Sequence, residues 1–390
     1  MSYRNLRVLF YRAGTCNEQR VIENLKKIVK EVVVVMQECK NNDIDAGLAK
    51  TLFLSVHMNK IDMIFSVDYY PIVAEVANTA GIAYISWVLD SPHYTLYSTT
   101  SYYDSSYIFH FDREECLRLQ AMGRTKVFHQ PLATDPDYFQ KQIDSSAKQK
   151  MTDISFLGSS YQNEHDYFDK SNGLSEYECG YFEGLMKAQS ELYGVSVMGQ
   201  ALPEDLQQRL LKACKIRLPE TYDLPMELVA VNILEKKLSV RERRDIVKRL
   251  SRTYGITLYS ESEALKMEGV TFRGYADYET QMPCAFAYSR ININPSLRNI
   301  HSGIPLRALD IMACGGFLLS NYQPELAEWF EDGKSVAMYG SMDELEEKAG
   351  YYLKHEDERK EVARRGYKVI CDQFTYDKAL ISILEKVDGI

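Results

Sequence analysis

Short apolar runs alternate with amphipathic stretches over the first 130 residues of the chain. The run at 31–36 reads EVVVVM, and helical periodicity follows it at 45–58. Such alternation predicts strand–helix–strand units, in which parallel strands form one sheet and helices cover both of its faces. Runs that are apolar throughout fit this arrangement because both faces of such strands are buried. The predicted strands are 6–11, 31–36, 63–67, 83–88, 107–111 and 126–130, and the predicted helices include 18–29, 45–58 and 72–78.

The same alternation begins again after residue 150 and predicts a second sheet. Its strands are 153–158, 256–260, 271–273, 290–294, 317–320 and 335–339. Between the first two of them, residues 163–250 have mainly helical patterns, which predicts a helical insertion. A last amphipathic pattern at 376–387 predicts a C-terminal helix. The fold class is therefore α/β, with two doubly wound parallel-sheet domains.

The domain boundary is predicted from the segment HQPLATDPDYFQKQ at 129–142. Its prolines and aspartates interrupt helix and strand alike, so it is interpreted as a linker, and Asp135-Pro136-Asp137 as a turn rather than a metal-binding pair. A chain of 390 residues favours two domains, and small ligands commonly bind in a cleft between two such domains. The predicted parts are an N-terminal domain at 1–130, a linker at 131–150, a second domain at 151–375 and a C-terminal helix at 376–390.

Composition narrows the class of protein. The chain has 46 basic and 55 acidic residues and no long basic run, which argues against a nucleic-acid partner. No apolar run reaches the roughly 18 residues of a membrane helix, and no secretory signal precedes the first strand pattern. The eight cysteines form no C-x-x-C pair and are expected to be reduced. We therefore expect a cytoplasmic protein without a transmembrane segment.

The stretch HSGIPLRALDIMACGGFLLSN at 301–321 carries the strongest candidate chemistry. A helix that follows a glycine-containing loop offers free N–H groups and the positive end of its dipole to a phosphate. Ser302, Gly303 and Ile304 are the candidates for this loop, and ordinary helix capping is the alternative. Arg307 and Asp310 follow on the helix, three residues apart. They form either a surface ion pair or two contacts to a ligand that has phosphates and hydroxyls.

This order of features resembles the nucleotide-sugar glycosyltransferases with the GT-B fold, and is most similar to the spore-maturation (spore-coat) type of bacterial glycosyltransferase. The resemblance rests on RALDIMACGGFLLSN, on the following PELAEWFEDGKSVAMY and on PLATDPDYF. It covers 270–390 and extends to 1–160. It implies two Rossmann-like domains that face a cleft, and transfer of a hexose from a nucleotide sugar, mostly a UDP-sugar, to a hydroxyl. The implied acceptor is a surface glycan or a protein, and neither a metal nor a further cofactor is implied.

The resemblance also assigns roles in the second domain. Asp310 occupies the position of a carboxylate that holds the ribose, while Ser302 stands where many relatives have a glutamate that touches the sugar. Arg307 would neutralise the diphosphate. The other candidates lie in loops that follow strands, where a plain turn is the alternative. They are Gly158 and Ser159 for phosphate or sugar, Arg298 (with Asn299 and His301) for phosphate, and Arg273, Gly274 and Tyr275 for the nucleobase.

The first domain is expected to supply the acceptor site and any general base. In SWVLDSPHYTLY at 86–97, a strand is followed by Asp90 and His93 at its carboxyl end, where sites form in open α/β sheets. Either side chain is a candidate base, and a turn with a surface histidine is the alternative. A base is required if the reaction inverts the anomeric centre. A nucleotide-sugar epimerase and a catalytically degenerate subunit that only binds remain alternative functions.

Overall fold

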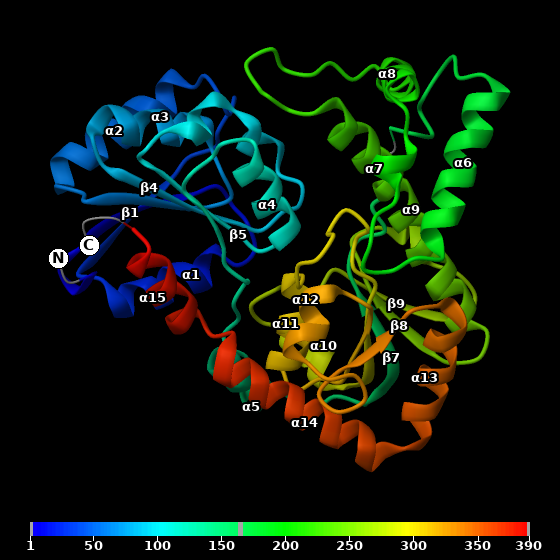
Figure 1. Ribbon diagram of the computed structural model, residues 1–390. Coiled ribbons are helices and arrows are strands. Elements are labelled where there is room, and N and C mark those ends of the chain that lie inside the picture. Colours follow the sequence, from blue (N-terminus) through cyan, green and yellow to red (C-terminus); the bar gives the residue numbers. More distant parts are fainter. Residues whose placement is uncertain (1–2, 163–166, 388–390) are drawn as a thin grey trace. The chain divides into compact units, whose positions relative to one another are not determined.

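The computed structural model of the protein describes residues 3–162 and 167–387 of the 390-residue chain. Residues 163–166, at the start of the expected insertion, lie outside this range. The chain divides into two compact units, each built on a six-stranded sheet (Figure 1). Unit 1 comprises Met1–Thr134, Pro219–Leu224 and Phe374–Ile390, and unit 2 comprises Asp135–Leu218 and Pro225–Gln373. All strand pairs in both sheets are parallel, so the predicted α/β fold class is confirmed.

The sheet of unit 1 has the strand order β2-β1-β3-β4-β5-β6. This is the flavodoxin-like order, and the direction of winding reverses between β1 and β3. The central strands form close to their predicted bounds because their apolar runs are buried on both faces of the sheet, whereas the edge strand β2 is largely exposed. The strands are β1 (Arg7–Arg12), β2 (Glu31–Met36), β3 (Met63–Val67), β4 (Ala83–Val88), β5 (Ser106–His110) and β6 (Val127–His129).

Helices cover both faces of this sheet, with α1 and α15 on one side and α2 and α3 on the other (Figure 1). The loop between β1 and α1 is fixed by Glu18, which is fully buried and accepts hydrogen bonds from the backbone N–H groups of Ala13 (2.8 Å) and Gly14 (2.9 Å). The elements are α1 (Glu18–Ile28), α2 (Ala46–Asn59), α3 (Pro71–Ala80), α4 (Arg113–Ala121), α15 (Tyr376–Glu385) and the 3₁₀ turns η1 (Tyr3–Asn5), η2 (Tyr94–Tyr97) and η3 (Thr99–Tyr102).

The segment Pro219–Leu224 belongs to unit 1, although the sequence pattern placed it inside the helical insertion of the second domain. Asp223 accepts a 2.6 Å hydrogen bond from Nη2 of Arg124, a guanidinium that is fully buried. Tyr222 pairs with Ser98 in a β-bridge and donates to Asp43 Oδ1 (2.9 Å). A local hydrophobic pattern cannot reveal this attachment, because a charge partner distant in sequence creates it.

The sheet of unit 2 has the strand order β12-β11-β10-β7-β8-β9. Counted within the unit, this is the Rossmann order, and the winding reverses between β7 and β10. All six strands lie close to their predicted positions. They are β7 (Thr152–Leu157), β8 (Ile256–Tyr259), β9 (Val270–Gly274), β10 (Ser289–Asn294), β11 (Leu318–Asn321) and β12 (Ala337–Tyr339).

The two faces of this sheet differ in polarity. Ile291 and Ile293 of β10 belong to an apolar cluster that includes buried side chains of α9 and α13. Asn292 points to the other face, where it accepts from Ser155 Oγ (2.7 Å) and donates to the carbonyl of Phe286 (3.1 Å) in α10. The helices are α5 (Pro136–Ser145), α6 (Glu176–Ser190), α7 (Met198–Ala201), α8 (Glu204–Ala213), α9 (Met226–Ser251), η4 (Glu263–Leu265), α10 (Met282–Ala287), α11 (Leu306–Ala313), α12 (Pro324–Trp329), α13 (Met342–Lys354) and α14 (Glu356–Gln373).

The predicted linker at 131–150 contains helix α5 rather than irregular chain. Asp135 caps this helix by accepting a 3.1 Å hydrogen bond from the backbone N–H of Tyr138, and Pro136 takes a position in the first turn. Both residue types are helix-start signals as well as turn formers. Their interpretation as residues that only interrupt structure was therefore wrong.

Gly315 and Gly316, within the 301–321 motif, are each required for a different structural reason. Gly315 follows α11 with φ +71°, the left-handed conformation that commonly ends a helix. Gly316 is required by packing, because a Cβ atom there would lie 2.7 Å from Asn292 Nδ2 and 2.9 Å from the carbonyl oxygen of Ile311. This pair of glycines joins α11 closely to β11.

Gly316→Ala should therefore lower the free energy of unfolding by about 1–3 kcal/mol, the usual cost of overpacking a buried site. Gly180→Ala on α6 is the matched control, since a Cβ there meets no heavy atom within 4 Å. The control should be neutral or slightly stabilising, because alanine favours helix. Urea unfolding followed by circular dichroism measures both, and equal effects of the two substitutions would contradict the packing argument.

Candidate functional site

The carboxyl ends of β7 and β10 lie side by side at the centre of the unit 2 sheet, where the strand order reverses. Open α/β sheets bind ligands at such a point. The loop after β7 carries Gly158 and Ser159, and the loop after β10 leads through residues 302–304 into α11. The topology therefore gathers candidates that are more than 100 residues apart in the chain.

Arg243 of α9 connects these two loops. Its Nη1 donates to the carbonyl oxygen of Ser159 (2.7 Å), and its Nη2 donates to that of Pro295 (3.0 Å). The residue is 9% exposed, and its Nε atom is buried without a hydrogen-bond partner. Burial lowers the pKa of Arg243, and the neighbouring charge of Arg307 lowers it as well. Sequence analysis missed this residue, although an arginine on the buried face of a long helix was a detectable signal.

Arg307 has a buried Nη1 atom without a hydrogen-bond partner. It forms no ion pair with Asp310, so the alternative of a simple pair at i and i+3 is excluded. Within residues 3–162 and 167–387, no carboxylate pairs with either Arg243 or Arg307. Two neighbouring guanidinium groups without a carboxylate favour an anionic ligand, and guanidinium is well shaped to bind phosphate oxygens.

Arg298, a predicted phosphate contact, is instead used to hold its own loop. Its Nε donates to Glu242 Oε2 (2.7 Å), and its Nη1 donates to the carbonyl oxygen of Leu192. The guanidinium lies 3.8 Å from the centre of the Tyr193 ring. Its donors are thus already engaged by the protein, and the interpretation of Arg298 as a ligand contact is corrected to a structural one.

One face of α9 holds the whole loop that follows β10. Glu235 accepts from His301 (3.0 Å), and the Ser239 hydroxyl accepts from the backbone N–H of Arg298 (2.8 Å). Asn232 accepts from Asn299 (3.0 Å) one turn earlier on the same face. This spacing of three to four residues places the contacts in a single row along the helix. The helical insertion therefore positions the segment that carries the phosphate candidates.

The predicted phosphate loop, Ser302, Gly303 and Ile304, is buried at the start of α11. The Ser302 hydroxyl donates to Glu325 Oε1 (2.7 Å), and the backbone N–H of Glu325 donates to the Ser302 carbonyl (3.1 Å). Pro305 occupies the N-cap position and provides no side-chain cap. The N-cap side chain therefore accepts no hydrogen bond from the backbone N–H groups of the first turn of α11.

Asp310 lies on the inner side of α11 and is 1% exposed. Burial raises the pKa of the nearby Cys314 thiol, and the charge of Asp310 raises it further. The carboxylate was expected to face an open site, and its burial differs from that expectation. Its role toward a ribose stays a prediction.

The nucleobase candidates lie at the edge of the sheet. Arg273 and Gly274 end β9, which β8 separates from β7, and Tyr275 follows with 60% of its surface exposed. Gly274 has φ +76°, and its carbonyl accepts from the backbone N–H of Ser260 (2.9 Å). The structure thus keeps these three residues apart from the Arg243–Arg307 pair, and their role stays a prediction.

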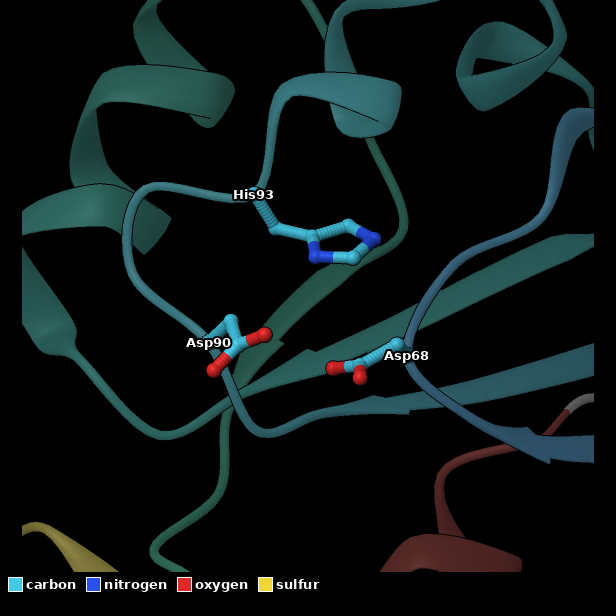
Figure 2. Close-up of side chains that lie close together, drawn as sticks. All are labelled: Asp68, Asp90 and His93. Carbon is cyan, nitrogen blue, oxygen red and sulfur yellow. The ribbon is translucent and has the colours of Figure 1, made fainter. Parts of the chain in front are cut away.

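In unit 1, the general-base candidates Asp90 and His93 lie together after β4, and Asp68 joins them from the end of β3 (Figure 2). One potential ligand atom from each of the three side chains lies within 4.8 Å of the others. Asp90 is exposed, His93 is half-buried and Asp68 is buried. His93 Nε2 lies 3.2 Å from the carbonyl oxygen of Tyr69.

Asp68 is the functional candidate that sequence analysis missed in unit 1. Burial raises its pKa to about 6, His93 opposes this increase and Asp90 adds to it. Its Oδ1 accepts from the backbone N–H of Leu89 (2.8 Å), which fixes the carboxylate beside β4. The signal was its place directly after β3, which matches the place of Asp90 after β4.

Comparisons with known proteins connect this structure to glycosyltransferases. Residues 241–385 match the sequence family described as glycosyl transferase-like. This segment includes Arg243, Arg307 and Asp310. Among curated proteins, none matches the sequence.

Three solved structures share the fold across nearly the whole chain. A glycosyltransferase from Rickettsia africae is 10% identical with a TM-score of 0.52, and each chain is covered to 100%. HepE from Anabaena, in complex with UDP-glucose, is 10% identical with a TM-score of 0.54, and 99% of this chain and 100% of HepE are covered. Sucrose-phosphate synthase from Thermosynechococcus elongatus is 9% identical with a TM-score of 0.55 over 98% of each chain. The fold is therefore that of the GT-B glycosyltransferases, as the sequence resemblance implied.

A helix must be both long and apolar to cross a membrane. Across residues 3–162 and 167–387, no helix is both long and apolar enough to cross a membrane.

Arg298 and Arg307 should respond differently to the same substitution. Arg298→Gln should lower the free energy of unfolding by about 3–5 kcal/mol, because Glu242 is left as a poorly compensated, largely buried charge. Arg307→Gln should change it by less than about 0.5 kcal/mol, since no hydrogen bond or ion pair is lost. Urea unfolding measures both. A large loss of stability in Arg307→Gln would show that its guanidinium is structural.

Proposed function

We propose that this protein is a glycosyltransferase that moves a sugar from a nucleotide sugar to a hydroxyl acceptor. The observation that carries the proposal is the pair Arg243 and Arg307, two adjacent guanidinium groups without a carboxylate partner at the point where the unit 2 sheet reverses its order. A diphosphate supplies the charge and the oxygen acceptors that such a pair lacks. The match of residues 241–385 to glycosyl transferase-like proteins supports the same conclusion.

Unit 2 would hold the donor. Arg243 and Arg307 would bind the diphosphate together with the N-terminal turn of α11, where positive charge from the helix dipole adds to theirs. They would also stabilise the charge that develops as the nucleotide leaves, so a metal is not needed for that purpose. Asp310 would take the ribose hydroxyls, which requires a small outward movement of a buried carboxylate. UDP is the proposed nucleotide, supported by the HepE structures that contain UDP-glucose or UDP and glucose.

Unit 1 would hold the acceptor and activate its hydroxyl. Asp90 is the most accessible carboxylate of the cluster, and His93 stands next to it. A carboxylate or an imidazole within hydrogen-bond reach of the hydroxyl can remove its proton as the new bond forms. Transfer of a hexose to a surface glycan or a protein, as in the spore-coat type, is the specific form that we propose.

The donor site is tested by calorimetric titration with UDP and uridine. UDP should bind the wild-type protein, and Arg307→Gln and Arg243→Lys should weaken it by about tenfold to a hundredfold, the loss of one charged hydrogen-bonding group. Uridine, which lacks phosphates, should bind all forms alike. Arg290→Gln is the control, because Arg290 is exposed at the amino end of the same strand, β10.

The Arg290→Gln control decides whether a loss of UDP affinity is specific to Arg243 and Arg307. Equal loss in Arg290→Gln would mean a general effect of net charge. If UDP, GDP and TDP all fail to bind the wild-type protein, the glycosyltransferase proposal is rejected.

The proposed roles of Asp90 and His93 are tested by measuring the rate of sugar transfer. Asp90→Asn and His93→Gln should leave UDP affinity unchanged, and at least one of them should reduce transfer by about a hundredfold, the smaller end of general-base effects. Release of UDP from a UDP-sugar, with and without candidate acceptors, measures it. Interconversion of free nucleotide sugars without any acceptor would indicate an epimerase. Nucleotide binding without turnover under any condition would indicate a subunit that only binds.

A further inference from the structure

The cluster in unit 1 brings together three side chains that can each ligate a cation (Figure 2). Asp68 comes from the end of β3, and Asp90 and His93 come from the end of β4. These strands are adjacent and parallel, so their carboxyl ends meet at one edge of the sheet. One ligand atom from each side chain lies within 4.8 Å of the other two.

The histidine presents a lone pair to the two carboxylates. Its Nε2 atom lies 3.2 Å from the Tyr69 carbonyl oxygen and 3.4 Å from the Tyr69 nitrogen. We assign the proton to Nε2, because the shorter contact is to a carbonyl oxygen, which only accepts. Nδ1 is then unprotonated, and it is the ring nitrogen that faces Asp68 and Asp90 in Figure 2.

Three acceptors therefore converge without a donor among them. Ionised carboxylates accept hydrogen bonds only, as does an unprotonated imidazole nitrogen. Asp68 is 4% exposed, and its Oδ1 is fixed by the backbone N–H of Leu89, so it cannot turn freely toward solvent. A positive occupant compensates such a group of acceptors, and it is either a proton held within the cluster or a metal cation.

We propose that Asp68, Asp90 and His93 form a binding site for a divalent metal cation in unit 1, with one carboxylate oxygen from each aspartate and Nδ1 of His93 as ligands. Two carboxylates and one imidazole suit Mn²⁺ and similar first-row cations. Asp90 is exposed, so the cation has access from solvent, and a small rotation of its side chain can shorten the ligand separations.

The site goes beyond the donor chemistry proposed above, which relies on arginines of unit 2. Three protein ligands leave further coordination positions for water or for a hydroxyl. If the proposed function holds, an acceptor hydroxyl bound there would ionise more easily, as water does on a bound metal, and Asp90 and His93 would then act through the cation rather than as general bases themselves. Binding of the cation itself does not depend on that function.

The test is a titration of metal-free, full-length protein with Mn²⁺, without nucleotide, followed by the electron paramagnetic resonance signal of free Mn²⁺. The wild-type protein should bind one equivalent. Asp68→Asn and His93→Gln should each weaken binding at least tenfold. Asparagine retains an oxygen that accepts from Leu89, so Asp68→Asn preserves the local fold.

Two exposed residues of unit 1 serve as matched controls, Asp104→Asn and His57→Gln. Both should bind Mn²⁺ like the wild-type protein. The proposal is overturned if the wild-type protein has no stoichiometric site, or if the Asp68 and His93 variants bind Mn²⁺ with the affinity of the wild-type protein. A proton would then be the positive group that compensates the cluster. UDP binding is measured separately without metal, so failure of the cation site and failure of the proposed function are distinguishable.

Discussion

The buried guanidinium of Arg243 is the constraint on which the donor half of the site depends. A charge removed from water needs compensation, yet its contacts are with neutral groups: two carbonyls, one in each loop at the centre of the unit 2 sheet, and the rings of Phe156 and Tyr161. These hydrogen bonds set the separation of the two loops. They leave the positive charge uncompensated, and Arg307 adds a second one beside it. An anionic ligand is the group that completes this arrangement.

The helical insertion holds these loops of unit 2 in place. The row of polar side chains on α9 fixes the loop after β10 at each turn, and the pair of Arg298 and Glu242 is its strongest contact. The same insertion also supplies Pro219–Leu224 to unit 1, where Asp223 compensates the buried Arg124. In both units, a buried arginine thus determines where a distant segment attaches.

Unit 1 uses a different chemistry at the carboxyl ends of its strands β3 and β4. Its cluster consists of acceptors, whereas the candidate groups of unit 2 are buried or half-buried guanidinium cations. The burial of Asp68, which raises its pKa, shows how strongly the protein environment acts on this group. The two units thus present opposite charges at the carboxyl ends of their strands, which agrees with the proposed separation of donor and acceptor binding.

The sequence by itself determined the two parallel sheets, because most of the twelve runs of strand length are apolar enough to be buried once the strands pair and helices cover the sheet. It also placed Ser159, Asp90 and His93 in loops at the carboxyl ends of strands, and Arg307 on the helix that follows such a loop. Only the tertiary structure decided that Arg298 holds its own loop, that Arg243 joins two loops of unit 2, that Asp68 lies beside Asp90 and His93, and that Asp310 is buried. The physical reason is that periodicity reports which side of an element is apolar, whereas the partner of a buried charge is set by segments that meet only when the chain has folded.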